Sequence, residues 1–198
     1  MAYDKFTRLT SSVVPLPIEN VDTDQIIPAR FLKATERKGF GDNLFRDWRY
    51  HQDGSPKADF VLNNSTYSGK ILVGGKNFGS GSSREHAAWA IYDYGFRCVI
   101  SSFFADIFKN NCLNIGVLPV QVSEDFLQAI FAAVEKDPST TVTVDLQSQT
   151  VTLEATAQQE RFEISSYKKQ NLQNGFDDID YLLNIESAIK EFAQSRPF

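Results

Sequence analysis

The chain has 198 residues, of which 42% are hydrophobic and 23% charged, and its formal net charge is −5. This length allows one large domain or a domain with an appendage, and the apolar fraction is sufficient for a hydrophobic core. The acidic balance argues against a general nucleic-acid-binding surface, which is usually basic. No apolar run reaches the ~18 residues that cross a bilayer, and the N-terminus lacks the apolar segment of a signal peptide. The sequence therefore predicts a cytoplasmic protein.

The residues that most often bind metals are few. Cys98 and Cys112 are the only cysteines, and His51 and His86 are the only histidines. Two thiolates cannot hold an iron–sulfur cluster, which needs three or four, and no zinc spacing is present. We expect both cysteines to be reduced core residues; a disulfide is the alternative, which a cytosolic location disfavours.

The first third of the chain contains an extended segment, a turn and a long irregular stretch. Residues 13–17 read VVPLP, and the prolines keep this segment from being helical. Asp22 and Asp24 follow in a turn, where two close carboxylates could bind a cation or orient a base, although an Asx-type turn is commoner. Residues 29–57 are polar and aromatic without regular periodicity, which predicts a long functional loop with short helical turns; a surface connector is the alternative.

A glycine- and serine-rich loop lies at the centre of the sequence. Residues 71–75 read as a buried strand, residues 77–87 as NFGSGSSREHA, and residues 87–94 as a helix that ends at Gly95. Ser82 and Glu85 match a capping box. Backbone N–H groups, the positive end of the helix dipole and Arg84 favour an anion here, such as a carboxylate or a phosphate. The loop fits no dinucleotide fingerprint, P-loop or nucleophile elbow. A well-capped helix without chemistry remains the alternative.

Strands and helices then alternate, which predicts an α/β fold with a partly parallel sheet. We expect strands at residues 97–101 and 117–120, and Pro119 suits an edge strand or a strand end better than a central position. The intervening helix at residues 103–111 has an apolar stripe of Phe104, Ile107 and Phe108.

The last third of the chain predicts a helix, a hairpin and a final helix. The helix spans residues 124–136, and the hairpin strands alternate at residues 142–146 and 151–155. Phe162 and Ile164 suggest a third strand. After Gly175 comes a C-terminal helix whose stripe we expect to pack on the core, with docking of a partner as a secondary use; its members are Ile179, Leu182, Ile185, Ile189 and Phe192. We predict a single domain over residues 1–198.

Four stretches in order carry a resemblance to a known family. Residues 20–28, 39–49, 77–87 and 102–108 resemble the swivelling domain of the aconitase superfamily, and within it the small subunits of isopropylmalate dehydratases. The resemblance is weakest after about residue 120. It implies a three-layer β/β/α swivelling domain with a mixed, partly parallel sheet. It also implies a hydro-lyase of leucine biosynthesis that interconverts 2- and 3-isopropylmalate. The implied [4Fe-4S] cluster is carried by a large partner subunit, in a heterodimer or higher assembly, and this chain binds no cofactor.

The resemblance also implies roles for single residues. Ser82, as an alkoxide, would be the catalytic base, and Asp24 would support an acid/base histidine on the partner. Ser83 and Arg84 would hold the substrate, and Phe31 and Leu32 are candidates for an apolar specificity contact. The spacing leaves the roles of three cations open; these are Arg30, Lys33 and Arg37.

Other interpretations remain open at this point. Glu85 and His86 could form an acid/base pair, but we favour a capping role for Glu85 and a place in the first helical turn for His86. The chain could also be the small subunit of a homoaconitase or related hydro-lyase, a non-catalytic anion-binding module, or a purely structural subunit.

Overall fold

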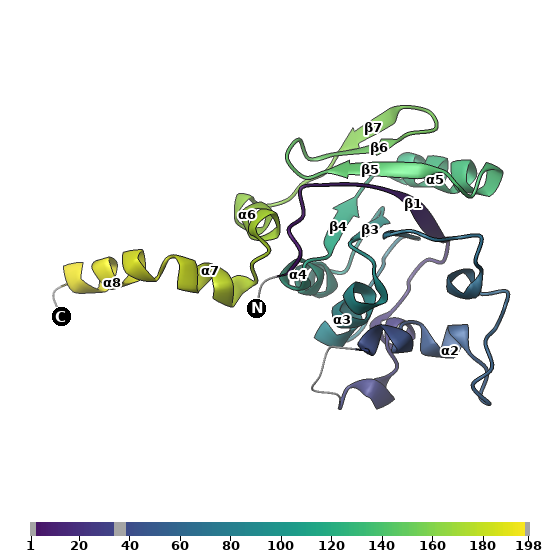
Figure 1. Ribbon diagram of the computed structural model, residues 1–198, viewed down its shortest axis with the longest axis horizontal. Helices are drawn as coiled ribbons and strands as arrows, with labels where there is room; N and C mark the ends of the chain where they lie inside the picture. The colour runs from purple at the N-terminus through teal and green to yellow at the C-terminus, as the bar shows by residue number, and fades with distance from the viewer. Residues whose placement is uncertain (1–2, 34–38, 197–198) are drawn as a thin grey trace.

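One long strand joins the two halves of a seven-stranded sheet. The computed structural model describes residues 3–33 and 39–196. In it, β1 (Arg8–Leu16) pairs in parallel with β2 (Ile71–Gly74) and antiparallel with β5 (Thr141–Asp145). The strand order is β4-β3-β2-β1-β5-β6-β7 (Figure 1). β3 (Cys98–Ser101) and β4 (Leu118–Gln121) extend the parallel half, and β6 (Thr150–Leu153) and β7 (Gln158–Arg161) extend the antiparallel half. The expected mixed sheet is confirmed, with Pro119 on edge strand β4.

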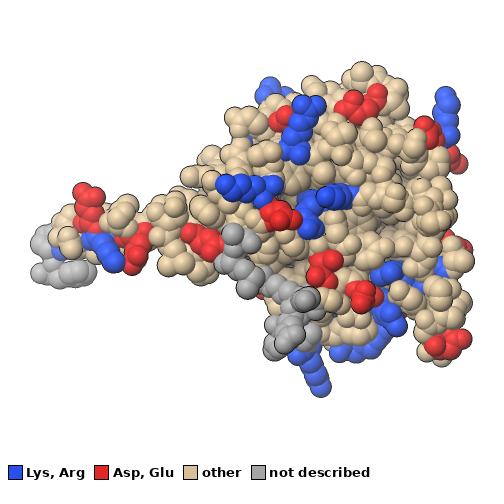
Figure 2. All heavy atoms as spheres, viewed as in Figure 1, with Lys and Arg blue, Asp and Glu red and all other residues tan. Residues whose placement is uncertain are grey.

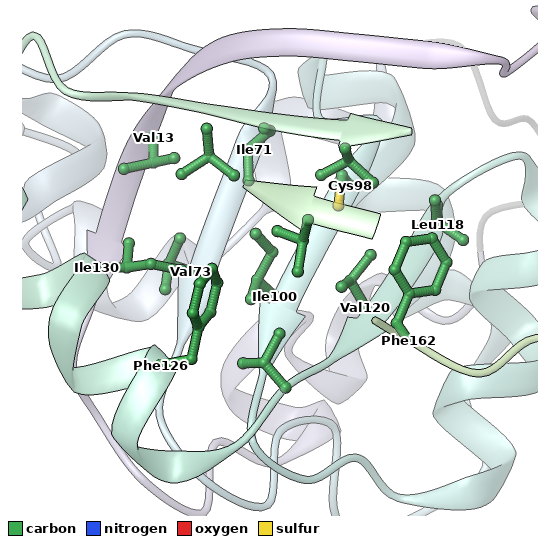
Figure 3. Packing of buried hydrophobic residues seen from close by; sticks show 14 of the residues in the cluster. Val13, Ile71, Val73, Cys98, Ile100, Leu118, Val120, Phe126, Ile130 and Phe162 are labelled. Atoms are coloured by element: carbon green, nitrogen blue, oxygen red, sulfur yellow. The ribbon is translucent and has the colours of Figure 1, made fainter. Parts of the chain in front are cut away.

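The alternation of side chains along the strands divides the core into two clusters. Val13 and Ile71 point into the first cluster, which Phe126 and Ile130 of α5 (Glu124–Lys136) and residues of the antiparallel strands complete (Figure 3). Val14 and Leu72 point to the opposite face, where α3 (Glu85–Tyr94) and α4 (Asp106–Ile115) pack. Antiparallel strands, parallel strands and helices therefore form the three expected β/β/α layers.

The connection from β1 to β2 contains only short helical segments in its described part. They are α1 (Thr23–Ile26), η1 (Ala29–Phe31), η2 (Phe40–Asn43), α2 (Arg46–Arg49) and η3 (Val61–Asn63). The Gly41 N–H donates to Asp93 Oδ2 at 2.7 Å, which ties η2 to α3. The connection thus lies against the helix that follows the glycine-serine loop.

Two predicted elements have different bounds in the structure. The third strand of the antiparallel half, β7, ends at Arg161, before Phe162 and Ile164, although Phe162 is buried in the first cluster. The helix predicted at residues 103–111 begins only at Asp106. Phe104 forms a parallel bridge with Phe78 instead, and this bridge delays the helix. Ile107 consequently lies outside the apolar stripe and is 54% exposed.

The prediction that the C-terminal stripe packs on the core is wrong. The single predicted helix is two helices, α7 (Asp178–Asn184) and α8 (Glu186–Ser195), which follow α6 (Ser166–Asn174). They extend away from the sheet and its helices (Figure 1). Ile179 is 63% exposed and Phe192 57% exposed. Within the described ranges, every helix is too short or too polar to span a bilayer.

Both cysteines are buried and free of a disulfide. Burial in the apolar interior raises the pKa of the Cys98 and Cys112 thiols, because it disfavours the charged thiolate. The expectation of reduced core cysteines is confirmed, and the disulfide alternative is wrong.

Candidate active site

The glycine-serine loop joins β2 to α3 at the carboxyl end of the parallel strands. Its backbone is left-handed at Asn77 (φ 62°), Gly79 (φ 79°) and Gly81 (φ 92°). A Cβ atom at Gly79 would lie 2.1 Å from Cγ of Phe108, so only glycine fits where the loop crosses α4. These turns leave Ser82 and Ser83 exposed to solvent.

A second segment, residues 21–26, braces this loop. The Gly79 N–H donates to the Val21 carbonyl oxygen at 2.7 Å, and the Thr23 N–H donates to the Ser80 carbonyl oxygen at 2.9 Å. Thr23 Oγ1 also donates to the Ser82 carbonyl oxygen at 2.9 Å, and Thr23 is only 2% exposed. The structure therefore brings together the two stretches from which the sequence predicted catalytic residues.

Asp24 and Arg84 meet across this junction. Arg84 Nη2 donates to Asp24 Oδ2 at 2.7 Å, Nη1 donates to Oδ1, and Nη1 also lies 3.4 Å from the Ile27 carbonyl oxygen. The Arg84 side chain is 12% exposed and the Asp24 side chain 55% exposed. The planar guanidinium thus already holds a carboxylate in the two-pronged geometry that suits it.

The capping box predicted for Ser82 and Glu85 is wrong. α3 begins at Glu85, with Arg84 as its N-cap and no side-chain capping bond. Ser82 lies two residues before this N-cap, where its carbonyl oxygen accepts a hydrogen bond from Thr23, and Glu85 Oε1 accepts a hydrogen bond from Trp89 Nε1 at 3.0 Å.

A capping box does occur nearby, on α1. The Asp22 carboxylate accepts from the Gln25 N–H and the Gln25 side chain accepts from the Asp22 N–H, both at 2.8 Å. The structural interpretation of Asp22 is therefore confirmed, and of the two carboxylates in the turn only Asp24 faces Arg84.

His86 lies in the first turn of α3, as expected. Its ring packs against Trp89, with centroids 4.4 Å apart, and against Phe40, with centroids 5.6 Å apart. Asn77 helps to shape the loop: its backbone is left-handed, and its side-chain amide donates a hydrogen bond to Asn20 Oδ1 at 2.9 Å.

Phe31 and Leu32 lie at η1, half-buried against the second core cluster. The Arg30 guanidinium lies 4.7 Å from the centroid of the Phe31 ring and pairs with Asp47. The hydrogen bond from Arg30 holds the pKa of Asp47 below its usual value. Lys33 is exposed, and Arg37 lies outside the described residues.

A cavity of about 750 Å³ lies beside this segment, between η1 and the residues around α2. Its lining includes Phe31, Tyr50 and three cations, Arg30, Arg46 and Lys57. Ser82, Ser83, Arg84 and Asp24 are not among the lining residues. The structure therefore unites the four polar candidates at one exposed junction and places Phe31 at a separate cavity.

In the part of the chain that the structure describes, no three His, Cys, Asp or Glu side chains gather into a group that could hold a metal ion. The chemistry available at the junction is thus that of two serine hydroxyls, an arginine and a carboxylate.

Sequence reasoning missed Thr23, which positions the serine loop. Its hydroxyl is bonded to a residue 59 positions away. No local pattern signals such a contact, because it exists only once β1 and β2 are paired.

Known proteins with this sequence pattern are dehydratase subunits. Residues 3–125 match the family model described as the aconitase C-terminal domain, and residues 128–166 match the LeuD_N model. A protein of Cytophaga hutchinsonii named 3-isopropylmalate dehydratase small subunit is 60% identical over 195 residues, covering 98% of this chain and 97% of the relative. A protein of the same name from Azobacteroides pseudotrichonymphae is 62% identical over 193 residues, covering 97% and 98%. The chain belongs to this family of small subunits.

A solved structure agrees with the fold of the 3-isopropylmalate dehydratase small-subunit family. The crystal structure of a 3-isopropylmalate dehydratase from Methanocaldococcus jannaschii superposes with a TM-score of 0.68, covering 93% of this chain and 98% of that one. At 24% identity this likeness bears on the fold alone. Membership of a small-subunit family makes the chain a component of a hydro-lyase and implies a larger partner subunit.

Proposed function

We propose that this chain is the small subunit of a 3-isopropylmalate dehydratase and acts in the cytoplasm, in leucine biosynthesis. Together with a larger subunit it would interconvert 2-isopropylmalate and 3-isopropylmalate by removal and re-addition of water. The observation that carries this proposal is the pair of exposed serines, Ser82 and Ser83, beside Arg84 in a loop braced by residues 21–26, in a chain that matches named small subunits over almost its whole length. An active site shared between two subunits would explain why Ser82 and Ser83 are exposed to solvent in this chain alone.

Ser82 is the group that we propose as the base. Dehydration requires removal of a proton from the carbon next to the one that bears the hydroxyl, and Ser82 Oγ as an alkoxide would take that proton and return it on rehydration. An alkoxide needs a strongly favourable environment. Ser82 lies three residues before the first residue of α3, and the guanidinium of Arg84 lies between them in sequence. The [4Fe-4S] cluster that we propose for the larger subunit would supply a Lewis-acidic iron for the departing hydroxyl.

Arg84 and Ser83 are the groups that we propose to hold a substrate carboxylate. The fork of Arg84 is held by Asp24 on one side and by the Ile27 carbonyl oxygen on another. A substrate carboxylate would share the guanidinium with Asp24 or take its place, and Asp24 would then be free to support an acid/base histidine of the larger subunit. Substrate binding and the release of Asp24 are coupled in this scheme.

Phe31 and Leu32 remain our candidates for the contact with the isopropyl group. η1 begins two residues after Ile27, whose carbonyl oxygen contacts Arg84. An apolar side chain on the substrate offers no group that an arginine could bind, and Arg30 already forms an ion pair with Asp47.

A non-catalytic anion-binding module is the second candidate function. One observation favours it: the Arg84 guanidinium holds the Asp24 carboxylate in the two-pronged geometry that would also bind an anion. Such a module would bind malate-type anions alone and would not need a second chain for its activity.

Anaerobic reconstitution with the purified larger subunit distinguishes the two. We expect turnover of isopropylmalate only when both subunits are present, with lower rates for malate-type substrates that have other side chains. Ser82→Ala should lower kcat by about 100-fold or more with little change in KM, as expected for loss of a base. Full turnover by Ser82→Ala would contradict the assigned base, and a lack of turnover with the larger subunit would favour the binding module.

A further inference from the structure

The last two helices carry a row of large apolar side chains that nothing in the described chain covers. Ile179, Leu182 and Leu183 of α7 are 49–64% exposed, and Ile189 and Phe192 of α8 are 45% and 57% exposed. Within each helix they recur at spacings of three or four residues, so they share one side. We call residues 177–196 the arm. Figure 1 shows it extending from the body beyond α6.

The fold is complete without the arm. The last residue of the buried clusters is Leu172, in α6. The second of the two family-model matches ends at residue 166, whereas the matches with the named small subunits cover 98% and 97% of this chain. The arm is therefore an addition to the swivelling domain that full-length small subunits share.

Polar bonds fix the base of the arm. Asp178 accepts hydrogen bonds from the Tyr167 hydroxyl at 2.8 Å and from Lys168 Nζ at 2.6 Å, and Lys168 also bonds Asn114 of α4. Tyr181 packs edge-to-face on Tyr167, with ring centroids 4.6 Å apart. The arm is thus attached at one end by groups that set its direction, while its apolar side faces solvent.

The exposed area and the charge of the arm indicate what covers it. Five large side chains exposed to this extent offer on the order of 500 Å² of apolar surface, about the size of the largest patch on a typical monomer, which is often functional. This is less than the ~800 Å² that each partner contributes to a standard interface, so two arms alone would form a small contact. A partner that also covers another face of the chain would add the missing area.

Charge argues against pairing with a second copy. The arm has five acidic residues and two basic ones, a net charge of −3, which becomes −2 when the pairing of Asp178 with Lys168 of α6 is counted. They are Asp177, Asp178, Asp180, Glu186 and Glu191 against Lys190 and Arg196. Acidic groups lie along the arm in Figure 2. Two arms side by side would therefore repel, whereas an apolar groove with a basic rim would attract each of them.

We propose that the arm docks into an apolar groove with a basic rim on the larger subunit. This rests on the proposed function for the existence of that partner and adds a second contact to it. The arm starts beside the beginning of β1, where Phe6 N–H bonds the Leu172 carbonyl oxygen, whereas the Ser82 loop lies beyond the end of β1. The nine residues of β1 span roughly 30 Å. The arm therefore holds the subunits together at a distance from the chemistry.

A matched pair of double variants tests this inference. Ile189→Asp with Phe192→Asp removes two apolar contacts of α8, and Ser187→Asp with Gln194→Asp adds the same charge on the other side of that helix. All four positions are exposed, so both variants should fold as the wild type does. We expect the apolar double variant to bind the purified larger subunit at least about tenfold more weakly and the control less than about threefold. At saturating larger subunit, kcat should be unchanged in both.

Three outcomes would overturn the inference. The first is equal affinity of the apolar variant and the wild type. The second is a wild-type dimer, seen by sedimentation velocity of the chain alone and abolished in the apolar variant, because a second copy would then be the occupant. The third is no binding of the wild type to the larger subunit, which would overturn the proposed function as well. If the wild type binds the larger subunit and turns over substrate, and the apolar variant binds with normal affinity, the arm proposal is wrong and the proposed function stands.

Discussion

The serine loop and the C-terminal arm are both exposed, but they are built in opposite ways. The loop is polar, and hydrogen bonds from residues 21–26 hold it along its length, including the bond from Thr23 to the Ser82 carbonyl oxygen. The arm is apolar on one side, and the described contacts of Asp178 and Tyr181 with α6 lie at its base. A site for chemistry needs fixed atoms, whereas a docking helix needs apolar area. We therefore assign catalysis to the loop and binding of the larger subunit to the arm. The substitutions below test whether these two functions can be changed independently.

The largest effect is expected at Ser82. Ser82→Ala should reduce kcat by about 100-fold or more in the reconstituted enzyme, because the proposed base is removed, and should leave binding of the larger subunit unchanged. Ser80→Ala is the matched control, since the loop uses the Ser80 carbonyl oxygen and not its hydroxyl in the Thr23 contact. Equal losses in the two variants would point to damage to the loop and not to loss of a base.

The next effect concerns the shape of the loop. Gly79→Ala should lower the free energy of unfolding by about 2 kcal/mol or more, because the new Cβ meets the Phe108 ring in a left-handed backbone. At Gly81 the nearest atom to a new Cβ is 3.4 Å away, so Gly81→Ala should cost only the backbone strain, about 1 kcal/mol. Urea denaturation measures both. Equal costs would mean that the contact with α4 does not restrict the loop.

A smaller effect on binding is expected at Arg84. Arg84→Lys keeps the charge but loses the two-pronged geometry, so KM for isopropylmalate should rise by about tenfold, with some loss of kcat. Asp24→Asn weakens the ion pair with Arg84 and keeps the shape of the side chain at position 24. If Asp24 only competes for the guanidinium, its variant should lower KM; a fall in kcat would support its proposed role beside a partner histidine.

The hydrogen bond from Thr23 Oγ1 to the Ser82 carbonyl oxygen should stabilise the folded chain by about 1 kcal/mol, the usual contribution of a buried hydrogen bond. Thr23→Val removes the hydroxyl at nearly constant volume, and it should lower both the free energy of unfolding and kcat. Thr23→Ser keeps the hydroxyl and should retain most of kcat. If Thr23→Val destabilised the chain without any change in kcat, Thr23 would have a structural role only.

The smallest effect on stability is expected in the arm. Ile189→Asp with Phe192→Asp should change the free energy of unfolding of the isolated chain by less than about 0.5 kcal/mol, because exposed residues contribute little to the core. A large loss would mean that the arm packs on the body, contrary to its exposure.

Periodicity and turn residues in the sequence predicted most of the sheet and its helices, because burial on one face leaves a regular pattern. They failed where a distant contact decides the outcome. Phe104 pairs with Phe78, so α4 begins only at Asp106. Ser82 lies two residues before the N-cap of α3, in a loop held by the bond from Thr23. The stripe of the arm has the same pattern as a core helix, so its exposure could not be read from spacing.

The candidate site was predicted residue by residue through the resemblance, but its internal bonds were not. Asp24 and Arg84 are 60 residues apart, and no local sequence pattern indicates that their side chains form an ion pair. The structure also places Phe31 at a cavity that excludes the serines.

A subunit-mixing experiment tests the central claim, that chemistry at Ser82 and assembly through the arm are separate, most directly. Limiting larger subunit is mixed with equal amounts of wild-type chain and Ser82→Ala chain, and turnover is measured. The account predicts about half of the wild-type rate, because the variant assembles but does not react. Adding Ile189→Asp and Phe192→Asp to the Ser82→Ala chain should restore nearly the full rate. Full activity in the first mixture, or unchanged inhibition in the second, would contradict the account.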